Sequence, residues 1–309
     1  MSDEFTELRP LLFSIAYRML GSVSDAEDVV QDAYLRYHGA VQDGTKIDSP
    51  KAYLSAVTTR LAIDLLRSAR VRRETYVGQW LPEPLLTDSA APDPGVQSVE
   101  SDSLSMAFLL VLERLSPVER AVFLLHDVFG YEFAEIANIV DKSEANCRQV
   151  AVRARKHVAA HRPRFEASRE QRDQLADRFV AALVEGDVDG LVKLLADDVV
   201  VTGDSGGISP SWPKAIIGRM KVARLMASVG HAMRKVTGVS IERTEVNGQP
   251  GAIVRDGSGA VVNVFSIEIA DGQVQTVRSV INREKLRHLG PLAELPELLA
   301  AVREVRTSD

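Results

Sequence analysis

Cysteine is almost absent from this chain of 309 residues, because Cys147 is the only one. A single thiol cannot form an intrachain disulfide, and no cluster of cysteine and histidine has the spacing of a zinc site. We therefore expect no metal site and no cofactor. A basic and apolar signal segment and a run of about 18 apolar residues are also missing. These absences favour a cytoplasmic protein without membrane contact.

Positive charge is scarce overall, since the formal net charge is −6. The basic residues are nevertheless clustered. Seven Lys and Arg residues lie between Lys142 and Arg164, against the single acidic residue Glu144. Such a local excess of positive charge suits the phosphates of a nucleic acid. The net charge of the whole chain is therefore a poor guide to its partners.

Glycine and proline are rare inside residues 5–74, where apolar residues recur at helical intervals. Residues 75–103 then contain four prolines and many small or acidic residues, which is typical of a linker. Helical periodicity resumes at Leu104 and continues to about Val158. We predict a first helical domain, a linker, a second helical domain, an α+β domain and a C-terminal tail, with the bounds 1–74, 75–103, 104–162, 170–286 and 287–309.

The α+β prediction depends on two helical stretches, at about 170–186 and 188–196, followed by β-rich runs. Three dipeptides typical of hairpin turns separate these runs, namely Asn247-Gly248, Asp256-Gly257 and Asp271-Gly272. Their spacing predicts an antiparallel meander. Because both faces of residues 262–267 are rather apolar, we expect helices to cover the sheet.

In the first helical domain, Ser24 and Glu27 fit a capping box that would begin a helix. The polar side of this helix carries an acidic stripe, formed by Asp25, Asp28, Gln31 and Asp32. The stripe suits a basic partner surface. Taken alone, however, the stripe favours a solvated face whose N-terminal acids stabilise the helix dipole.

A second helix is predicted to begin at Ser49-Pro50, with the serine as N-cap, and to carry an apolar stripe formed by Leu54, Val57, Leu61 and Leu65. Arginines accumulate towards its C-terminal end, at Arg60, Arg67, Arg70, Arg72 and Arg73. Basic residues at a helix C-terminus also complement the dipole, so the pattern alone leaves a structural role and DNA contact both open.

Residues 133–158 predict a helix-turn-helix. Phe133, Ile136, Ala137 and Val140 form one apolar face, and after the turn DKSEA the next helix places Cys147, Val150, Ala151, Ala154 and Val158 facing back. The residues left exposed can read base edges and hold phosphates in a major groove. They are Asn146, Arg148, Gln149, Arg153, Arg155 and Lys156.

Together these segments resemble the two domains of extracytoplasmic-function (group 4) sigma factors of RNA polymerase, over residues 5–74 and 104–160. The resemblance implies that the acidic stripe binds the β′ clamp helices of core RNA polymerase. It also implies that the arginine-rich helix contacts the −10 promoter element and that the helix-turn-helix contacts the −35 element.

The C-terminal part resembles the SigJ-like subfamily, in which a cone-shaped SnoaL-like domain follows the sigma domains. Residues 80–84 read WLPEP, residues 204–208 stand in place of a DGGGK loop, and residues 282–286 resemble an NPDKL motif with Arg283 for proline. The resemblance implies a regulatory interface formed by Trp80, Leu81, Pro82, Glu83, Asp204, Gly206, Gly207, Asn282, Lys285 and Leu286.

Other functions stay open for the C-terminal domain. Related cone-shaped folds include polyketide cyclases and ketosteroid isomerases, for which Asp198, Asp204 and His231 would be candidate acids or bases. A small-ligand sensor is a further possibility. A dimeric helix-turn-helix repressor would share the basic helix but would not explain the first helical domain. We expect a sigma factor without catalytic residues of its own, regulated by its C-terminal domain.

Overall fold

The computed structural model of the chain describes residues 3–74, 76, 78–87, 103–160, 168–207 and 214–294. These residues form two compact units. The first unit contains the described residues up to 74 together with 103–160, and the second contains 76–87 together with the residues from 168 onwards. Residues 76–87, which the sequence assigns to a linker, therefore belong to the same unit as the C-terminal domain.

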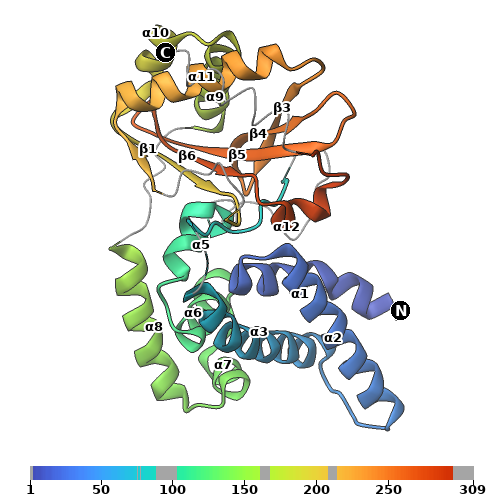
Figure 1. Cartoon of the computed structure of the whole chain (residues 1–309). Helices are drawn as coiled ribbons and strands as arrows, with labels where there is room; N and C mark the ends of the chain where they lie inside the picture. Colours follow the sequence, from blue (N-terminus) through green and yellow to red (C-terminus); the bar gives the residue numbers. More distant parts are fainter. Residues whose placement is uncertain are drawn as a thin grey trace. The chain divides into compact units, whose positions relative to one another are not determined.

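The first unit is helical (Figure 1). Its helices are α1 (Asp3–Leu20), α2 (Val23–Gln42), α3 (Pro50–Glu74), α5 (Met106–Leu112), α6 (Pro117–Phe123), the π-helical turn η1 (Leu124–Val128), α7 (Phe133–Val140) and α8 (Glu144–Ala159). Helices α1, α2 and α3 pack on one another, and α3 also packs on α6 and α7.

The N-cap of α2 corrects the sequence prediction. Gly21, with φ of 66°, ends the preceding helix, and Ser22 then takes an extended conformation and accepts a hydrogen bond from the Asp25 N–H at 3.1 Å. Ser24 lies inside the first turn instead. The capping box predicted at Ser24 and Glu27 is therefore wrong by two residues, because only Gly21 and Ser22 lie between the two helices and Ser22 takes the N-cap position.

Helix α3 begins as predicted, since the Ser49 hydroxyl accepts from the Ala52 N–H at 3.2 Å. Its buried face differs from the predicted stripe. Val57, Leu61 and Leu65 are only half-buried. The fully buried positions include hydroxyl side chains and are Leu54, Ser55, Thr58, Thr59, Ala62, Ile63 and Leu66. An apolar pattern could not reveal this face because three of its residues are polar.

The helix-turn-helix forms as predicted. Helix α7 ends at Asp141, which has a left-handed φ of 52°, and the Ser143 hydroxyl caps α8 by accepting from the Asn146 N–H at 3.2 Å. The predicted inward face of α8 is buried throughout, at Cys147, Val150, Ala151, Ala154 and Val158. Burial raises the pKa of the Cys147 thiol, which is consistent with a packing residue.

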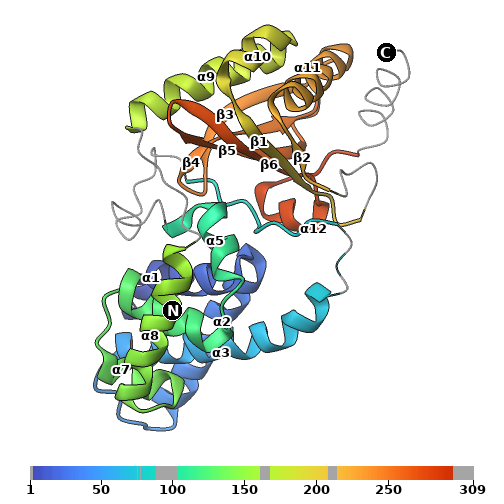
Figure 2. The same ribbon diagram turned by 90° about the vertical axis from the view of Figure 1, so that its left-hand side faces the viewer.

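The second unit is an α+β domain. Its elements are α9 (Arg169–Glu185), α10 (Val188–Leu194), β1 (Leu195–Asp204), β2 (Ile216–Ile217), α11 (Arg219–Lys235), β3 (Ser240–Val246), β4 (Gln249–Arg255), β5 (Val261–Ala270), β6 (Gln273–Val280), α12 (Arg283–Leu286) and the 3-10 turn η2 (Arg287–Leu289). Helices α9, α10 and α11 cover one face of the sheet (Figure 2). The core lies between these helices and the sheet, as the apolar strands predict.

The sheet is mixed, with the strand order β2-β1-β6-β5-β4-β3. The predicted antiparallel meander is present from β3 to β6. Strand β1, however, pairs with β6 in parallel. Helix α11 supplies the long connection between the start of the sheet and the meander, and such a connection is what a parallel neighbour requires. The sequence analysis did not anticipate this helix.

Two of the three predicted turns have the expected geometry. Asn247 and Gly248 both have positive φ, and so do Asp271 and Gly272. This backbone conformation matches a tight hairpin of two residues. The turn after Asp256 is longer, because its carboxylate accepts hydrogen bonds from the N–H groups of Ser258 and Ala260, at 2.9 and 3.0 Å.

Candidate regulatory and nucleic-acid-binding sites

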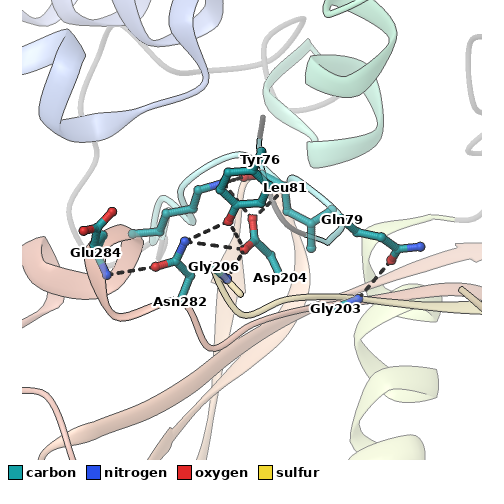
Figure 3. Close-up of polar contacts among 9 residues, drawn as sticks. Tyr76, Gln79, Leu81, Gly203, Asp204, Gly206, Asn282 and Glu284 are labelled. Carbon is teal, nitrogen blue, oxygen red and sulfur yellow. Dashed lines mark hydrogen bonds and ion pairs between the residues drawn. The ribbon is translucent and has the colours of Figure 1, made fainter. Parts of the chain in front are cut away.

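A buried polar cluster joins residues 76–81 to the sheet of the second unit (Figure 3). At its centre is Asp204, the last residue of β1, which is fully buried. Its Oδ2 accepts from the Leu81 N–H at 2.8 Å, and its Oδ1 accepts from the Gly206 N–H at 3.0 Å and from the Tyr76 hydroxyl. A buried carboxylate is stable only with such partners.

Lys285, on α12, supplies the opposite charge. Its Nζ lies 2.7 Å from Asp204 Oδ2 and also donates to the Leu81 carbonyl oxygen. The same ammonium group lies 4.3 Å from the ring centre of Trp80 and 5.1 Å from that of Tyr76. Cation–π contact with two rings and a buried ion pair therefore converge on one side chain.

Asn282 connects α12 with the other members of this cluster. Its Nδ2 donates to the Tyr76 hydroxyl at 2.9 Å, and its Oδ1 caps α12 by accepting from the Glu284 N–H at 3.0 Å. Gly206 lies close to this amide. A Cβ atom at position 206 would lie 2.7 Å from Asn282 Nδ2. The φ of Gly206, 64°, also favours glycine. The site thus requires glycine at this position.

The rest of the segment is attached to the β3–β4 hairpin and to η2. Leu86 forms an antiparallel bridge with Val246. Asn247 Oδ1 accepts from the Leu85 N–H at 3.0 Å, and the Asn247 N–H donates to the Leu85 carbonyl at 2.8 Å. His288 Nε2 lies 2.8 Å from the Pro84 carbonyl oxygen. The segment is therefore fixed at both of its ends.

The structure brings together most residues of the predicted regulatory interface. Leu81, Pro82, Glu83, Lys285 and Leu286 are buried, and Trp80 is half-buried. Gly207 lies in the exposed turn after β1, while Ile208 falls outside the described residues. Sequence reasoning missed four contributors, namely Tyr76, Gln79, Asn247 and His288. No local pattern could identify them, because their partners lie more than 100 positions away in the chain.

All six polar residues predicted for DNA contact on α8 are exposed. Gln149 and Lys156 lie along its outermost line, opposite the buried face. The arginines lie on the flanks and pair with carboxylates: Arg148 with Glu144, Arg153 with Glu119 at 3.9 Å, and Arg155 with Asp127 at 2.6 Å. Sequence reasoning missed Val152, which is 63% exposed on the outermost line between Gln149 and Lys156.

The acidic stripe of α2 is accessible. Asp28, Gln31 and Asp32 are exposed and Asp25 is half-buried. The side chains of Asp28, Gln31 and Asp32 form no hydrogen bond or ion pair with any described residue. These side chains are therefore available to a partner.

On α3, Arg60 already has partners. Its Nε donates to the Ile139 carbonyl at 2.9 Å and its Nη2 to the Asn138 carbonyl at 2.6 Å, at the C-terminal end of α7. Arg67 pairs with Asp64 at 3.1 Å, and both side chains are largely exposed. The side chains of Arg70, Arg72 and Arg73 lie outside the described residues.

The three candidate catalytic residues do not share a site. Asp198 and Asp204 are six positions apart on β1, which corresponds to about 20 Å along a strand. Asp198 is exposed, Asp204 is neutralised by Lys285, and His231 lies on the exposed side of α11. Among the described residues no group of His, Cys, Asp and Glu could hold a metal ion, and no helix in this part of the chain is long and apolar enough to cross a membrane.

Comparison with known proteins agrees with this architecture. Residues 5–72 match the Sigma-70 region 2 family and residues 105–158 match Sigma-70, region 4. The ECF RNA polymerase sigma factor SigJ of Mycobacterium tuberculosis is 40% identical over 292 residues, which is 92% of each chain. The probable ECF RNA polymerase sigma factor SigI of the same species is 30% identical and covers 90% of this chain and 92% of its own length. The crystal structure of SigJ covers 95% of this chain and all of its own, with a TM-score of 0.73 and 36% identity.

Proposed function

Because this chain belongs to the extracytoplasmic-function sigma factors, which direct RNA polymerase to promoters and are not enzymes, we propose a division of this work among its surfaces. The protein binds RNA polymerase core and promoter DNA. The acidic stripe of α2 is the part that binds the β′ clamp helices. Its three exposed members without partners among the described residues support this role, since a basic surface can approach them without breaking an existing ion pair.

Helix α8 enters the major groove at the −35 element. Asn146 and Gln149 can form bidentate hydrogen bonds with adenine, and Val152 can contact a thymine methyl group. The arginines on the two flanks hold the phosphates on either side of the groove. The observation that carries this assignment is the order across α8, with Gln149, Val152 and Lys156 outermost and the arginines on the two flanks.

Helix α3 contacts the −10 element through its arginines. Positions −10 and −35 are about 25 base pairs apart, or roughly 85 Å at 3.4 Å per base pair. In the free chain, however, α3 packs directly on α7 through Arg60. The Ser55 hydroxyl of α3 also forms a hydrogen bond of 2.7 Å with the hydroxyl of Tyr131, which lies just before α7. The two sigma regions therefore have to separate when both elements are bound.

The C-terminal domain regulates this separation by holding residues 76–87, the segment that follows region 2. Because the segment is bound to Asp204, Lys285 and the β3–β4 hairpin, the length of free chain between the two sigma regions depends on whether the C-terminal domain retains it. No catalytic role is needed for this function. A cyclase is less well supported, because the candidate acids and bases do not share a site.

The decisive experiment is reconstitution with core RNA polymerase and promoter-dependent transcription. Replacing Arg148 and Arg153 with alanine should reduce promoter-specific transcription while binding to core persists. As a matched control, Asp28→Asn with Asp32→Asn should weaken core binding and leave the DNA-binding surface of α8 intact. If the arginine variant lost core binding instead, the assignment of the two surfaces would be wrong.

A further inference from the structure

Helix α11 is basic and contains no acidic residue. Residues 170–309 together contain 17 Lys and Arg residues and 19 Asp and Glu residues, so an acid-free basic helix departs from its surroundings. Its basic residues are Arg219, Lys221, Arg224, Arg234 and Lys235. These basic side chains do not pack in the core, because α11 contacts the core through Val222, Ala223, Met226 and Ala227.

Four of the five cations of α11 have no carboxylate partner among the described residues. Several arginines elsewhere in this domain do pair with a carboxylate, and so does Arg219 at the start of α11, which pairs with Asp197. By contrast, Lys221, Arg224, Arg234 and Lys235 are exposed, and none of them forms an ion pair with a described residue. A helix stabilised by its own surface charges would carry acids at i+3 or i+4 positions.

Three of these cations form one line. Residues 221, 224, 228, 231 and 235 follow the helical period and are occupied by Lys, Arg, Ser, His and Lys, all on the side facing away from the sheet. From the first to the last the line is about 21 Å long, at 1.5 Å per residue. Ser228, at its centre, adds a short hydroxyl side chain that can donate to a phosphate oxygen.

We propose that this outer face of α11 binds the phosphate backbone of duplex DNA beside the elements contacted by α3 and α8. Cations along an extended line, without ion pairs to the described residues, suit a linear polyanion, and their neutralisation of phosphates releases counterions. The proposal rests on the promoter binding proposed above, because α11 can add a DNA contact only where α3 and α8 already bind the promoter. It assigns α11 a contact without sequence information, which adds affinity to the two sequence-reading helices.

The test uses holoenzyme assembled from core RNA polymerase and the full chain. Its affinity for a fluorescent promoter duplex is measured over a series of salt concentrations, once with long flanks and once with a duplex that ends at the two elements. The variant carries Lys221→Gln, Arg224→Gln and Lys235→Gln, which keeps good helix formers. The control carries Lys46→Gln, Arg169→Gln and Arg255→Gln, and so loses the same charge from cations that already pair with carboxylates.

The α11 variant should bind the long duplex at least tenfold more weakly. The slope of log K against the logarithm of the salt concentration should become less steep by about 2 to 3, because each lost phosphate contact contributes about 0.9. The control should match the unmodified holoenzyme, and the short duplex should be affected less. An unchanged salt dependence would overturn the proposal. Weaker binding of core polymerase with unchanged DNA affinity would also overturn it, because α11 would then face an acidic protein surface. Retained recognition of the promoter elements in either case would leave the sigma function itself intact.

Discussion

The ammonium group of Lys285 lies 2.7 Å from the carboxylate of Asp204, and the two side chains are 9% and 0% exposed. Eighty-one positions separate them in the chain. This pair holds α12 to the end of β1, and the same two side chains bind the backbone of Leu81 from both sides, one through its N–H and the other through its carbonyl.

Replacing Lys285 with methionine should destabilise the C-terminal domain by about 3–5 kcal/mol, because it leaves the Asp204 carboxylate buried without its counter-charge. Thermal or denaturant unfolding would measure this loss. The double variant Lys285→Met with Asp204→Asn should recover much of the stability, since no buried charge remains unpaired. A double variant as unstable as the single one would show that the charge pair is not the source of the effect.

Tyr76 should make the stability of the C-terminal domain decrease with pH in the alkaline range. Burial raises the pKa of its hydroxyl above the usual 10, and the neighbouring Asp204 carboxylate raises it further. Because the folded state keeps the proton more tightly than the unfolded state, this contribution is complete below pH 10 and is lost as the pH rises above it.

The variant Tyr76→Phe removes both the hydrogen bonds and the titration. It should be less stable than the unmodified protein by about 1–3 kcal/mol at neutral pH, since Asp204 and Asn282 each lose a partner. The difference between the two proteins should shrink as the pH rises above 10, which unfolding measured at several pH values would detect. A difference independent of pH would contradict the assigned role of the hydroxyl.

Val152 should contribute to the choice of promoter. If it contacts a thymine methyl in the −35 element, Val152→Ala should lower the affinity for that element, and replacing the contacted thymine with uracil should have the same effect as the mutation. Combining the two changes should cause no further loss. Competition binding with each thymine replaced in turn provides the measurement. Additive losses would place Val152 away from the methyl group.

Arg60 and Arg67 provide a matched pair on α3. Arg60→Ala removes two hydrogen bonds to carbonyls at the end of α7 and should destabilise the first unit by about 1–2 kcal/mol. Arg67→Ala removes an exposed pair with Asp64 and should cost less than about 0.5 kcal/mol. Unfolding experiments on both variants would separate packing from DNA contact. Equal effects on stability would argue against a specific role for Arg60 in the packing of α3 on α7.

Local features were predictable where a short pattern determines the structure. The cap at Ser49 and the inward face of α8 are examples, because each depends on residues within a few turns of one helix. Helix α11 was missed, since the turn signals that follow it indicate strands. The cap of α2 was misplaced because Ser22 and Ser24 compete for the same role, and the positive φ of Gly21 decided between them.

The polar cluster could be predicted only in part. The resemblance to a sigma factor subfamily identified Asp204, Asn282 and Lys285, but composition and spacing alone gave no reason to bring them together. Tyr76 and Asn247 were not anticipated, because each depends on a partner from a distant part of the chain. Long-range hydrogen bonds of this kind leave no periodic signal in the sequence.

Residues 78–87 are held by the C-terminal domain, through the bridge between Leu86 and Val246 and through the contacts of Leu81, and this affects how deletion variants should be interpreted. A chain cut short before β1 loses the residues that cover Leu81 and satisfy its backbone, so an apolar side chain and unpaired amide groups become newly exposed to water. Any change in transcription could then result from the loss of regulation or from aggregation of a less soluble protein, and the two effects would not be separated. Point substitutions within the hairpin leave that apolar surface covered and provide the cleaner comparison.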